Sequence, residues 1–591
     1  MDDNTFMSNI NIACKKHSLW FGVILPGELI EERQRLSGMA AKGRAPLATE
    51  VKRTVRGGTA LVKALEANGV RTVFGIPGVH TLDAYDALVD SDFVDTILPR
   101  HEQGAGFMAD GYYRASGKPG VALIVTGPGV TNVATAVGEA YADSSKVLVI
   151  ATNLEREYLD KLEGNLHELR DQMGIMEPIT KWSQRVMSAQ EIPGAISEAL
   201  HQLDVGRPRP VYLEIPLDVL AEECEIEELP VAQTHVELPN PAQVNEAADQ
   251  IRAGGKLLVF AGGGTVSEGA SEALTEFVEL TGAVVFTSLM GKGSIPEDHP
   301  RALGAFGYRW SADSPIVPYM EASDTCLAIG TGLGLRTTAN GSMPLPDKLI
   351  HVDLDSNEFN KRYQADVAIQ ADAEATLRAL IDNIKQNGGP KEQWAEDQIT
   401  PGREANFQPA DERAARYVPY LKALREAIPR DGIVINDMTM MSYEAARYFP
   451  VYGPRTYTFP RGFGTLGSSL PTAIGAKVAR PDRSVVSING DGGVQFTLTE
   501  LGAAVHHKIP VPFVIFNDST HTAVKAAQQR TYPGRFIDVD LVNPDYVKIA
   551  EAYGIPGLRA ESPEELTKML RDALRGNTPV IIDVPINLER Y

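Results

Sequence analysis

The sequence is poor in cysteine and has no long apolar run. Its 591 residues include three cysteines, Cys14, Cys224 and Cys326, which lie far apart. Their odd number and wide spacing exclude a disulfide framework and a CxxC metal site, and they are typical of a chain in a reducing cytoplasm. No apolar stretch approaches the roughly 18–20 residues needed to cross a bilayer, so we expect a cytoplasmic protein without membrane-spanning helices.

Basic residues are also scarce. Lys and Arg number 56 against 77 Asp and Glu, which gives a formal net charge of -21. Such a surface repels phosphate backbones and anionic lipid, which argues against nucleic acid and membranes as partners. Apolar residues make up 43% and charged residues 23%, as in globular rather than disordered chains. The length corresponds to about three to four domains.

The first 55 residues lack the regular pattern of the rest. Their short apolar stretch, Leu19 to Leu25, is not followed by a small-residue cleavage site. Several acidic residues come next, whereas transit peptides are poor in acids. We expect residues 1–55 to be a disordered extension, or the product of an upstream start codon with Met39 as the true start.

From residue 56 onward, short apolar runs alternate with helical patterns in three series. Alternation of this kind predicts βαβ units and parallel sheets covered by helices on both faces. The fold class is therefore α/β, with three doubly wound domains at residues 56–225, 246–385 and 412–591, joined by linkers at 226–245 and 386–411. The expected strands are residues 70–75, 121–126, 147–150 and 211–215, then 256–261, 283–286, 325–329 and 349–353, then 433–436, 485–488, 512–516 and 580–583.

The most informative segment lies in the third series. One buried strand delivers Gly490-Asp-Gly-Gly493, and the next delivers Asn517-Asp-Ser-Thr520. Carboxylates on neighbouring strand ends, here Asp491 and Asp518, form half a cage for a hard cation such as Mg²⁺. Gly492 and Gly493 allow backbone N–H groups to approach a phosphate. Thr497-Leu-Thr-Glu500 predicts a capping box at the start of the following helix.

This arrangement resembles the diphosphate motif of the thiamine diphosphate-dependent enzymes. Their common form ends in Asn-Asn, whereas this chain has Asn517-Asp518. The resemblance implies thiamine diphosphate and Mg²⁺ as cofactors. It further implies that Asp491, Asp518 and the backbone carbonyl of Thr520 are the metal ligands. In chain order, the three domains would be a pyrimidine-binding domain, a middle domain and a diphosphate-binding domain.

Two further segments match the family. Arg100-His-Glu-Gln-Gly-Ala105 resembles its catalytic glutamate segment, which makes Glu102 the acid that hydrogen-bonds N1′ of the aminopyrimidine. Without the resemblance, Glu102 would be interpreted as a capping carboxylate at a helix start. Gly462 to Gly475 resembles the stretch in which a bulky residue, here Leu466, wedges the two cofactor rings apart, while the Gly464 carbonyl faces the 4′-amino group. Thr439 could donate to the diphosphate.

Within the superfamily, the domain order and the segment Met290 to Pro300 resemble the acetolactate synthase-like group. The resemblance implies decarboxylation of a 2-oxo acid with carboligation, and a place in branched-chain amino acid biosynthesis. It also implies a homodimer or homotetramer with the cofactor between the first domain of one subunit and the third of its partner. A regulatory small subunit is compatible with it. Related middle domains bind FAD, ADP or nothing, and Arg336 and Asp353 lie where a nucleotide could be held.

Several residues depart from true acetolactate synthases. Ala527 replaces a tryptophan that helps choose the second 2-oxo acid, and His167-Glu168 replaces a Phe-Gln pair. These changes favour a simple decarboxylase, similar to 5-guanidino-2-oxopentanoate decarboxylase, with Glu168 giving the pocket an acidic character. The fragment left after CO₂ departs is then protonated rather than joined to a second carbonyl.

Histidines are the candidates for that proton transfer. His80 and His521 rank first because both follow strand-end segments, ahead of His101 and His167. The adjacent His506 and His507 are expected at the surface.

Two functions of other classes stay open. Ala261-Gly-Gly-Gly264 follows a strand and could serve a nicotinamide-dependent oxidoreductase, although no acidic residue ends the next strand. A non-catalytic cofactor-binding protein would keep the fold but lose Glu102, which is present.

Overall fold

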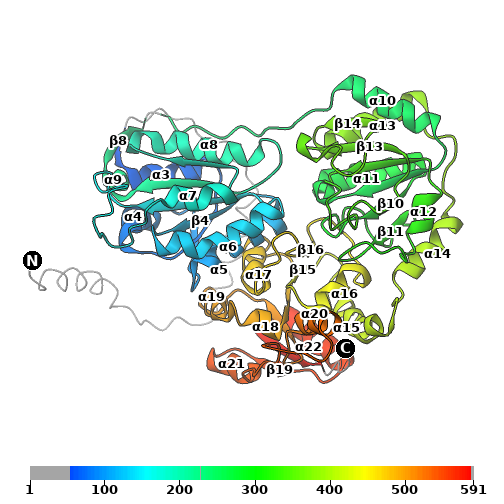
Figure 1. The fold of residues 1–591 in the computed structure, drawn as a ribbon. Helices are drawn as coiled ribbons and strands as arrows, with labels where there is room; N and C mark the ends of the chain where they lie inside the picture. Colours follow the sequence, from blue (N-terminus) through cyan, green and yellow to red (C-terminus); the bar gives the residue numbers. More distant parts are fainter. Residues whose placement is uncertain (1–52, 227, 587–591) are drawn as a thin grey trace, which may run out of the picture. The chain divides into compact units, whose positions relative to one another are not determined.

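Three parallel six-stranded sheets, each covered by helices on both faces, follow one another along the chain (Figure 1). The computed structural model describes residues 53–226 and 228–586. The expected extension, residues 1–55, lies outside the described residues except for its last three. No helix in the described part of the chain is both long and apolar enough to cross a bilayer.

The first sheet has the order β3-β2-β4-β5-β7-β6. Alternate residues of its central strands face opposite cores: Val121 and Leu123 pack with α3 and α8, whereas Ala122 and Ile124 pack with α5 and α6. A short antiparallel ribbon joins β1 (Arg53–Arg56) to β8 (Glu223–Ile226). The remaining elements are β2 (Thr72–Gly75), η1 (Val79–Thr81), α4 (Leu82–Val89), β3 (Asp95–Ile97), α5 (Glu102–Ser116), β4 (Gly120–Ile124), α6 (Pro128–Ala142), β5 (Val147–Asn153), α7 (Gln172–Met176), β6 (Trp182–Arg185), α8 (Ile192–Asp204), β7 (Val211–Pro216) and α9 (Leu217–Ala221), with α3 at Gly57–Ala67.

The third sheet, β16-β15-β17-β18-β20-β19, repeats this order strand for strand. Its helices α15, α16 and α22 cover one face, and α17, α19 and α21 the other. The bounds are α15 (Glu412–Ala427), β15 (Ile433–Asn436), α16 (Met440–Tyr448), β16 (Tyr457–Thr458), α17 (Ser469–Ala479), β17 (Val485–Gly490), α18 (Asp491–Val494), η6 (Leu498–Glu500), α19 (Leu501–His506), β18 (Pro512–Asn517), α20 (Thr522–Thr531), α21 (Tyr546–Ala552), β19 (Gly557–Arg559), α22 (Pro563–Arg575) and β20 (Val580–Pro585).

The middle sheet has a different order, β11-β10-β9-β12-β13-β14. In chain order this is 3-2-1-4-5-6, the dinucleotide-binding arrangement, with its crevice between β9 and β12. The second expected linker, residues 386–411, contains α14. The bounds are α10 (Pro241–Ala253), β9 (Leu257–Ala261), α11 (Glu268–Thr281), β10 (Val284–Thr287), β11 (Ala302–Ala305), α12 (Val317–Glu321), β12 (Thr325–Ile329), β13 (Lys348–Asp353), β14 (Val367–Gln370), α13 (Ala373–Asn387) and α14 (Glu396–Asn406).

The first and third domains share one core through α5 and α17. A Cβ on Gly111 of α5 would collide with the Thr472 carbonyl, and a Cβ on Gly475 of α17 would collide with the Met108 carbonyl. Glycine at both positions therefore lets the two backbones touch. Residues 108 and 111 face 475 and 472 in turn, so the two helices run antiparallel.

The expected α/β class and all of the expected strands are confirmed.

Candidate active site

Glu102 is the first residue of α5, at the carboxyl edge of the first sheet. The capping role is filled by its neighbour, because the His101 Nδ1 accepts the Gln103 N–H at 3.1 Å. The Glu102 carboxylate instead accepts the Asn132 side-chain amide at 2.9 Å. Asn132 lies in α6, which starts at the end of β4. Glu102 is therefore held as an oriented acid and not as a helix cap.

Asp491 and Asp518 extend from β17 and β18, which are neighbours in the third sheet. Asp491 accepts the Asn543 amide at 2.6 Å, and Asp518 accepts the Thr522 hydroxyl. Burial raises the pKa of Asp491, and burial together with the nearby charge of Asp491 raises the pKa of Asp518 to about 6. The two carboxylates therefore repel each other, which is the situation that a cation between them would relieve.

The described residues contain no group of three or more His, Cys, Asp or Glu side chains that could hold a metal. A cation here would take its other oxygens from the backbone and from its ligand. The Thr520 carbonyl, two residues beyond Asp518, accepts a long bond of 3.4 Å from the Thr522 hydroxyl and no shorter one from the part of the chain that the structure describes. The donor set therefore fits Mg²⁺, which usually takes one or two carboxylates plus phosphate oxygens.

Asp437, which follows β15, contacts Gly467 and Gly493 at the carboxyl edge of the third sheet. Its buried carboxylate accepts the Gly467 N–H at 2.9 Å, and a Cβ on Gly493 would collide with it. Burial raises the pKa of Asp437 to about 7. Gly464 has a φ of +75° in the same loop, a conformation that favours glycine. Leu466 lies between these two glycines of the loop and is half-buried.

Thr439 and His521 flank the Gly490–Gly493 segment. The Thr439 hydroxyl lies 2.9 Å from the place a Cβ on Gly490 would take, and the His521 ring lies 2.6 Å from the corresponding place on Gly492. Larger residues at either glycine would therefore displace a neighbour. The structure thus brings Asp491, Gly492 and His521 together on the third sheet.

His80 belongs to the first domain and stacks on His167, with ring centroids 4.9 Å apart. His80 is buried, and burial and then the charge of His167 lower its pKa. Neither Nδ1 atom has a hydrogen-bond partner among the described residues. His167 lies against Gly127, in the loop that leads from β4 to the helix carrying Asn132. The pair therefore lies beside the segment that orients Glu102.

Glu102 and Leu466 of one chain lie at opposite ends of the α5–α17 pair. Glu102 begins α5, and Leu466 lies three residues before the start of α17, the antiparallel partner helix. At 1.5 Å per helical residue, Glu102 and Ser469, the first residue of α17, are about 18 Å apart along the pair. A single chain therefore does not bring these two predicted site residues together.

Family models match all three domains. They are described as the thiamine pyrophosphate enzyme N-terminal TPP binding domain at residues 55–175, the central domain at 244–380 and the C-terminal TPP binding domain at 437–584. The chain belongs to the thiamine pyrophosphate enzyme family. Thiamine pyrophosphate is thiamine diphosphate, so the expected family is confirmed.

Each of the following three relatives of this thiamine pyrophosphate enzyme aligns with 90% of the chain. The "Probable acetolactate synthase large subunit" of Methanocaldococcus jannaschii is 36% identical, with 92% of its length covered. The "Probable 2-ketoarginine decarboxylase" of Pseudomonas aeruginosa is 37% identical, with 93% covered. The "Acetolactate synthase isozyme 3 large subunit" of Escherichia coli is 32% identical, with 95% covered.

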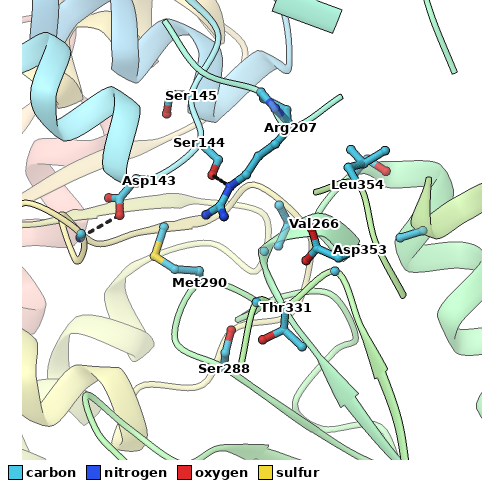
Figure 2. A pocket seen from close by; sticks show the side chains of 18 of the residues that line it. Asp143, Ser144, Ser145, Arg207, Val266, Ser288, Met290, Thr331, Asp353 and Leu354 are labelled. Atoms are coloured by element: carbon cyan, nitrogen blue, oxygen red, sulfur yellow. Dashed lines mark hydrogen bonds between the residues drawn. The ribbon is translucent and has the colours of Figure 1, made fainter. Parts of the chain in front are cut away.

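The middle domain of this thiamine pyrophosphate enzyme borders a cavity of about 560 Å³. Its floor is the crevice between β9 and β12, where the Gly264 N–H donates to the Gly330 carbonyl at 3.0 Å. Figure 2 shows Arg207 extending into the cavity toward Ser144, to whose hydroxyl it donates at 2.8 Å, and Arg207 also donates to the Glu358 carboxylate at 3.0 Å. Arg336, expected near a nucleotide, instead donates to the Tyr308 hydroxyl at 2.8 Å.

Sequence reasoning missed several contacts of the site. The capping box is wrong: the Thr497 hydroxyl donates to the Gly467 carbonyl at 2.6 Å, and Glu500 accepts the Arg100 N–H. His507 is also not a free surface residue, because its Nε2 accepts the Leu98 N–H at 2.8 Å. Glu500 and His507 bond residues of the first domain, and Thr497 bonds a loop 30 residues away in its own domain, so no local spacing could reveal these contacts.

Proposed function

We propose that this enzyme decarboxylates a 2-oxo acid and joins the remaining fragment to a second 2-oxo acid, in the manner of an acetolactate synthase. The observation that carries the proposal is the pair of matched sheet edges. One bears an oriented acid, Glu102, and the other bears two adjacent carboxylates, Asp491 and Asp518, beside the backbone amides of Gly492 and Gly493.

The roles assigned here rest on the family resemblance, with which these positions are compatible. Thiamine diphosphate, when bound, supplies an electron sink for the pair of electrons that remains when CO₂ leaves. Glu102 would hold a proton against the aminopyrimidine, and the Gly464 carbonyl would accept from its amino group. Leu466 would press between the two rings. The Gly492 and Gly493 amides and the Thr439 hydroxyl would bind the diphosphate, and Mg²⁺ would bind Asp491, Asp518 and the Thr520 carbonyl.

We infer that the working unit contains at least two copies of the chain. The in-chain separation of Glu102 and Leu466 supports this, because both must contact one aminopyrimidine. Large apolar side chains around the loops are uncovered in the single chain: Phe463 and Phe496 are each 59% exposed, and Val542 is 100% exposed. A homodimer or homotetramer would cover them. The relatives named as large subunits make a regulatory small subunit a further candidate partner.

The second candidate function is decarboxylation without carboligation. It is favoured by the stacked His80 and His167, which offer an imidazole proton donor near the Glu102 segment, and by the 2-ketoarginine decarboxylase relative. The expected role of Glu168 in binding a cationic substrate has less support. Its carboxylate already accepts three backbone amides, those of residues 163–165. His521 is the corresponding proton donor on the third domain.

We also propose that the middle-domain cavity holds an adenine nucleotide, FAD or ADP. Its volume lies within the roughly 300–1,000 Å³ of small-molecule sites, and the strand order is that of dinucleotide-binding sheets. Flavin absorbance of the purified protein tests FAD, and thermal stabilisation by ADP tests the alternative. A protein without flavin that no adenine nucleotide stabilises would refute this proposal.

A panel of 2-oxo acids tests the main proposal. Pyruvate, 2-oxobutanoate and 5-guanidino-2-oxopentanoate are supplied with Mg²⁺ and thiamine diphosphate, and CO₂, aldehyde and acetohydroxy acid are measured together. Carboligation gives acetohydroxy acid from pyruvate, whereas the second candidate gives CO₂ and aldehyde from the guanidino acid. A parallel arm with NAD detects hydride transfer. Absence of CO₂ from every acid would refute both functions.

The same panel bears on the metabolic role of the protein. Acetohydroxy acid as the product would support a place in branched-chain amino acid biosynthesis. Cys224 and Cys326 are free thiols, which is compatible with the cytoplasmic location that we propose.

A further inference from the structure

Two buried glutamates occupy corresponding places in the first and third domains. Glu139 lies in α6, which follows β4, and Glu500 ends η6, which follows β17. The strands β4 and β17 hold the same position in their sheets. Each glutamate is 1% exposed, and each directs its carboxylate at the other domain. A carboxylate that is buried without a bound cation is costly, so its retention calls for a specific partner.

Glu500 holds the segment that leads into Glu102. Its two oxygens accept the Arg100 N–H at 3.1 and 3.0 Å. The Arg100 guanidinium donates to the Gly502 carbonyl at 3.2 Å, which adds a second bond between the same segments. The fit is tight, because a Cβ on Gly104 would collide with Glu500 Oε1. The start of α5 is therefore fixed from the third domain.

Glu139 holds the loop that carries Gly464 and Leu466. It accepts the Phe463 N–H at 3.4 Å and the Thr465 N–H at 2.9 Å, one on each side of Gly464. Four residues along the chain, Asp143 accepts the Arg461 and Gly462 N–H groups at 3.2 and 2.8 Å. Arg114 donates to Asp143 at 3.0 Å. Four of the five successive loop residues 461–465, all but Gly464, thus donate their backbone N–H to the first domain.

We propose that Glu139 and Glu500 are reciprocal positioning residues of the cofactor site. Glu500 sets the direction of the Glu102 side chain, and Glu139 sets the orientation of the Gly464 carbonyl and the position of Leu466. The proposal rests on the function proposed above, because it assigns these segments to thiamine diphosphate. Neither glutamate touches the cofactor in this scheme. Glu139 acts through the Phe463 and Thr465 amides and Glu500 through the Arg100 amide, so the alignment of the acid and of the ring wedge depends on how the two domains pack.

Glu139→Gln and Glu500→Gln test the proposal. An amide keeps one accepting oxygen but turns an NH₂ group toward the backbone N–H that the other oxygen accepts, which pushes the segment away. We expect kcat to fall by about 10²-fold in either variant, the size of effect that a misplacement of about 1 Å produces. Glu444→Gln is the matched control, since Glu444 is buried in the third domain and pairs with Arg413 instead. It is expected to keep the wild-type kcat.

A second readout separates positioning from loss of structure. The rate at which the C2 proton of bound thiamine diphosphate exchanges with deuterium reports the alignment of Glu102 and Gly464 without any substrate. We expect slower exchange in both variants, with secondary structure and melting temperature close to those of Glu444→Gln. If Glu500→Gln does not fold, Gly104→Ala is the alternative variant. Its added methyl group would collide with the Glu500 carboxylate and push it away from the Arg100 N–H, so we expect the same slower exchange of the C2 proton.

The outcomes distinguish the two levels of inference. If the wild type binds no thiamine diphosphate, the proposed function fails. If the wild type binds it and reacts, but both glutamine variants exchange the C2 proton and turn over like Glu444→Gln, the positioning role is refuted while the function stands.

Discussion

The first and third domains have the same strand order but carry different chemistry at their carboxyl edges. In the first, Glu102 follows the edge strand β3 and accepts a hydrogen bond from Asn132. In the third, the corresponding edge strand β16 leads into the Gly464–Leu466 loop, and the central strands deliver Asp491 and Asp518. The comparison teaches that the sheet supplies only positions, and that the residues after each strand decide what is bound there.

The largest expected effect on kcat comes from replacing Glu102, the proposed catalytic acid of the first domain. Glu102→Gln keeps the size of the side chain but removes the proton that the proposed role requires, so kcat should fall by roughly 10²–10⁴-fold. Binding of thiamine diphosphate, measured by calorimetry, should change little. Glu66→Gln is the control in the same domain, because Glu66 bonds Ser91 at 2.6 Å away from the sheet edge. Full activity of Glu102→Gln would remove the assigned difference between the domains.

The third domain should respond in binding rather than in turnover. Asp491→Asn removes one of the two adjacent charges, and we expect Mg²⁺ affinity to fall by at least the roughly 10–100-fold that loss of an outer-shell partner costs a metal site. Saturating Mg²⁺ should restore much of the activity. Asp482→Asn, an exposed aspartate paired with Arg480, is the control. Unchanged Mg²⁺ dependence in Asp491→Asn would contradict the metal assignment.

The packing between the two domains can be tested through its glycines. Gly475→Ala places a methyl group against the Met108 carbonyl, and overpacking of this kind costs about 1–3 kcal/mol. Chemical denaturation measures the loss. Gly194→Ala in α8 is the control, because its Cβ meets nothing within 4 Å and alanine favours the helix. Equal stability of the two variants would show that the helices do not need contact at this crossing.

The smallest effect concerns the dependence of stability on pH. Burial, followed by the charge of Glu102, raises the pKa of Glu500 from 4.5 to about 7. The folded state therefore binds this proton more tightly than the unfolded state does, and the free energy of unfolding should decline as pH rises from about 4.5 to about 7. Glu500→Gln, compared with wild type by denaturation at pH 5, 6, 7 and 8, should show a shallower decline. An identical slope would contradict the raised pKa.

The sequence analysis predicted the inner strands of each sheet and missed the edge strands. The expected strands are the four inner ones of every sheet, for example β2, β4, β5 and β7 in the first. Inner parallel strands are covered on both faces and form continuous apolar runs. Edge strands such as Asp95–Ile97 and Tyr457–Thr458 are short and partly exposed, so they leave no such run.

The same distinction applies to the site. Asp491, Asp518 and Glu102 follow inner or edge strands within recognisable segments, so their positions could be predicted. Glu139 and Glu500 bond residues more than 300 positions away in the chain, and no local pattern carries that information. Asp437 directly follows the predicted strand 433–436, but its bond to Gly467 depends on tertiary packing, which no local pattern shows.

The antiparallel crossing of α5 and α17 has a consequence for how two coenzyme molecules would share a pair of chains. Each crossed helix pair has Glu102 near one end and Leu466 near the other, so in the proposed dimer every pair would be a rigid strut between the two coenzyme sites. A shift of the strut on binding of the first coenzyme would then move groups at the second site. Titration with thiamine diphosphate would then deviate from a simple hyperbola, and the two halves of the assembly would fill in sequence rather than independently.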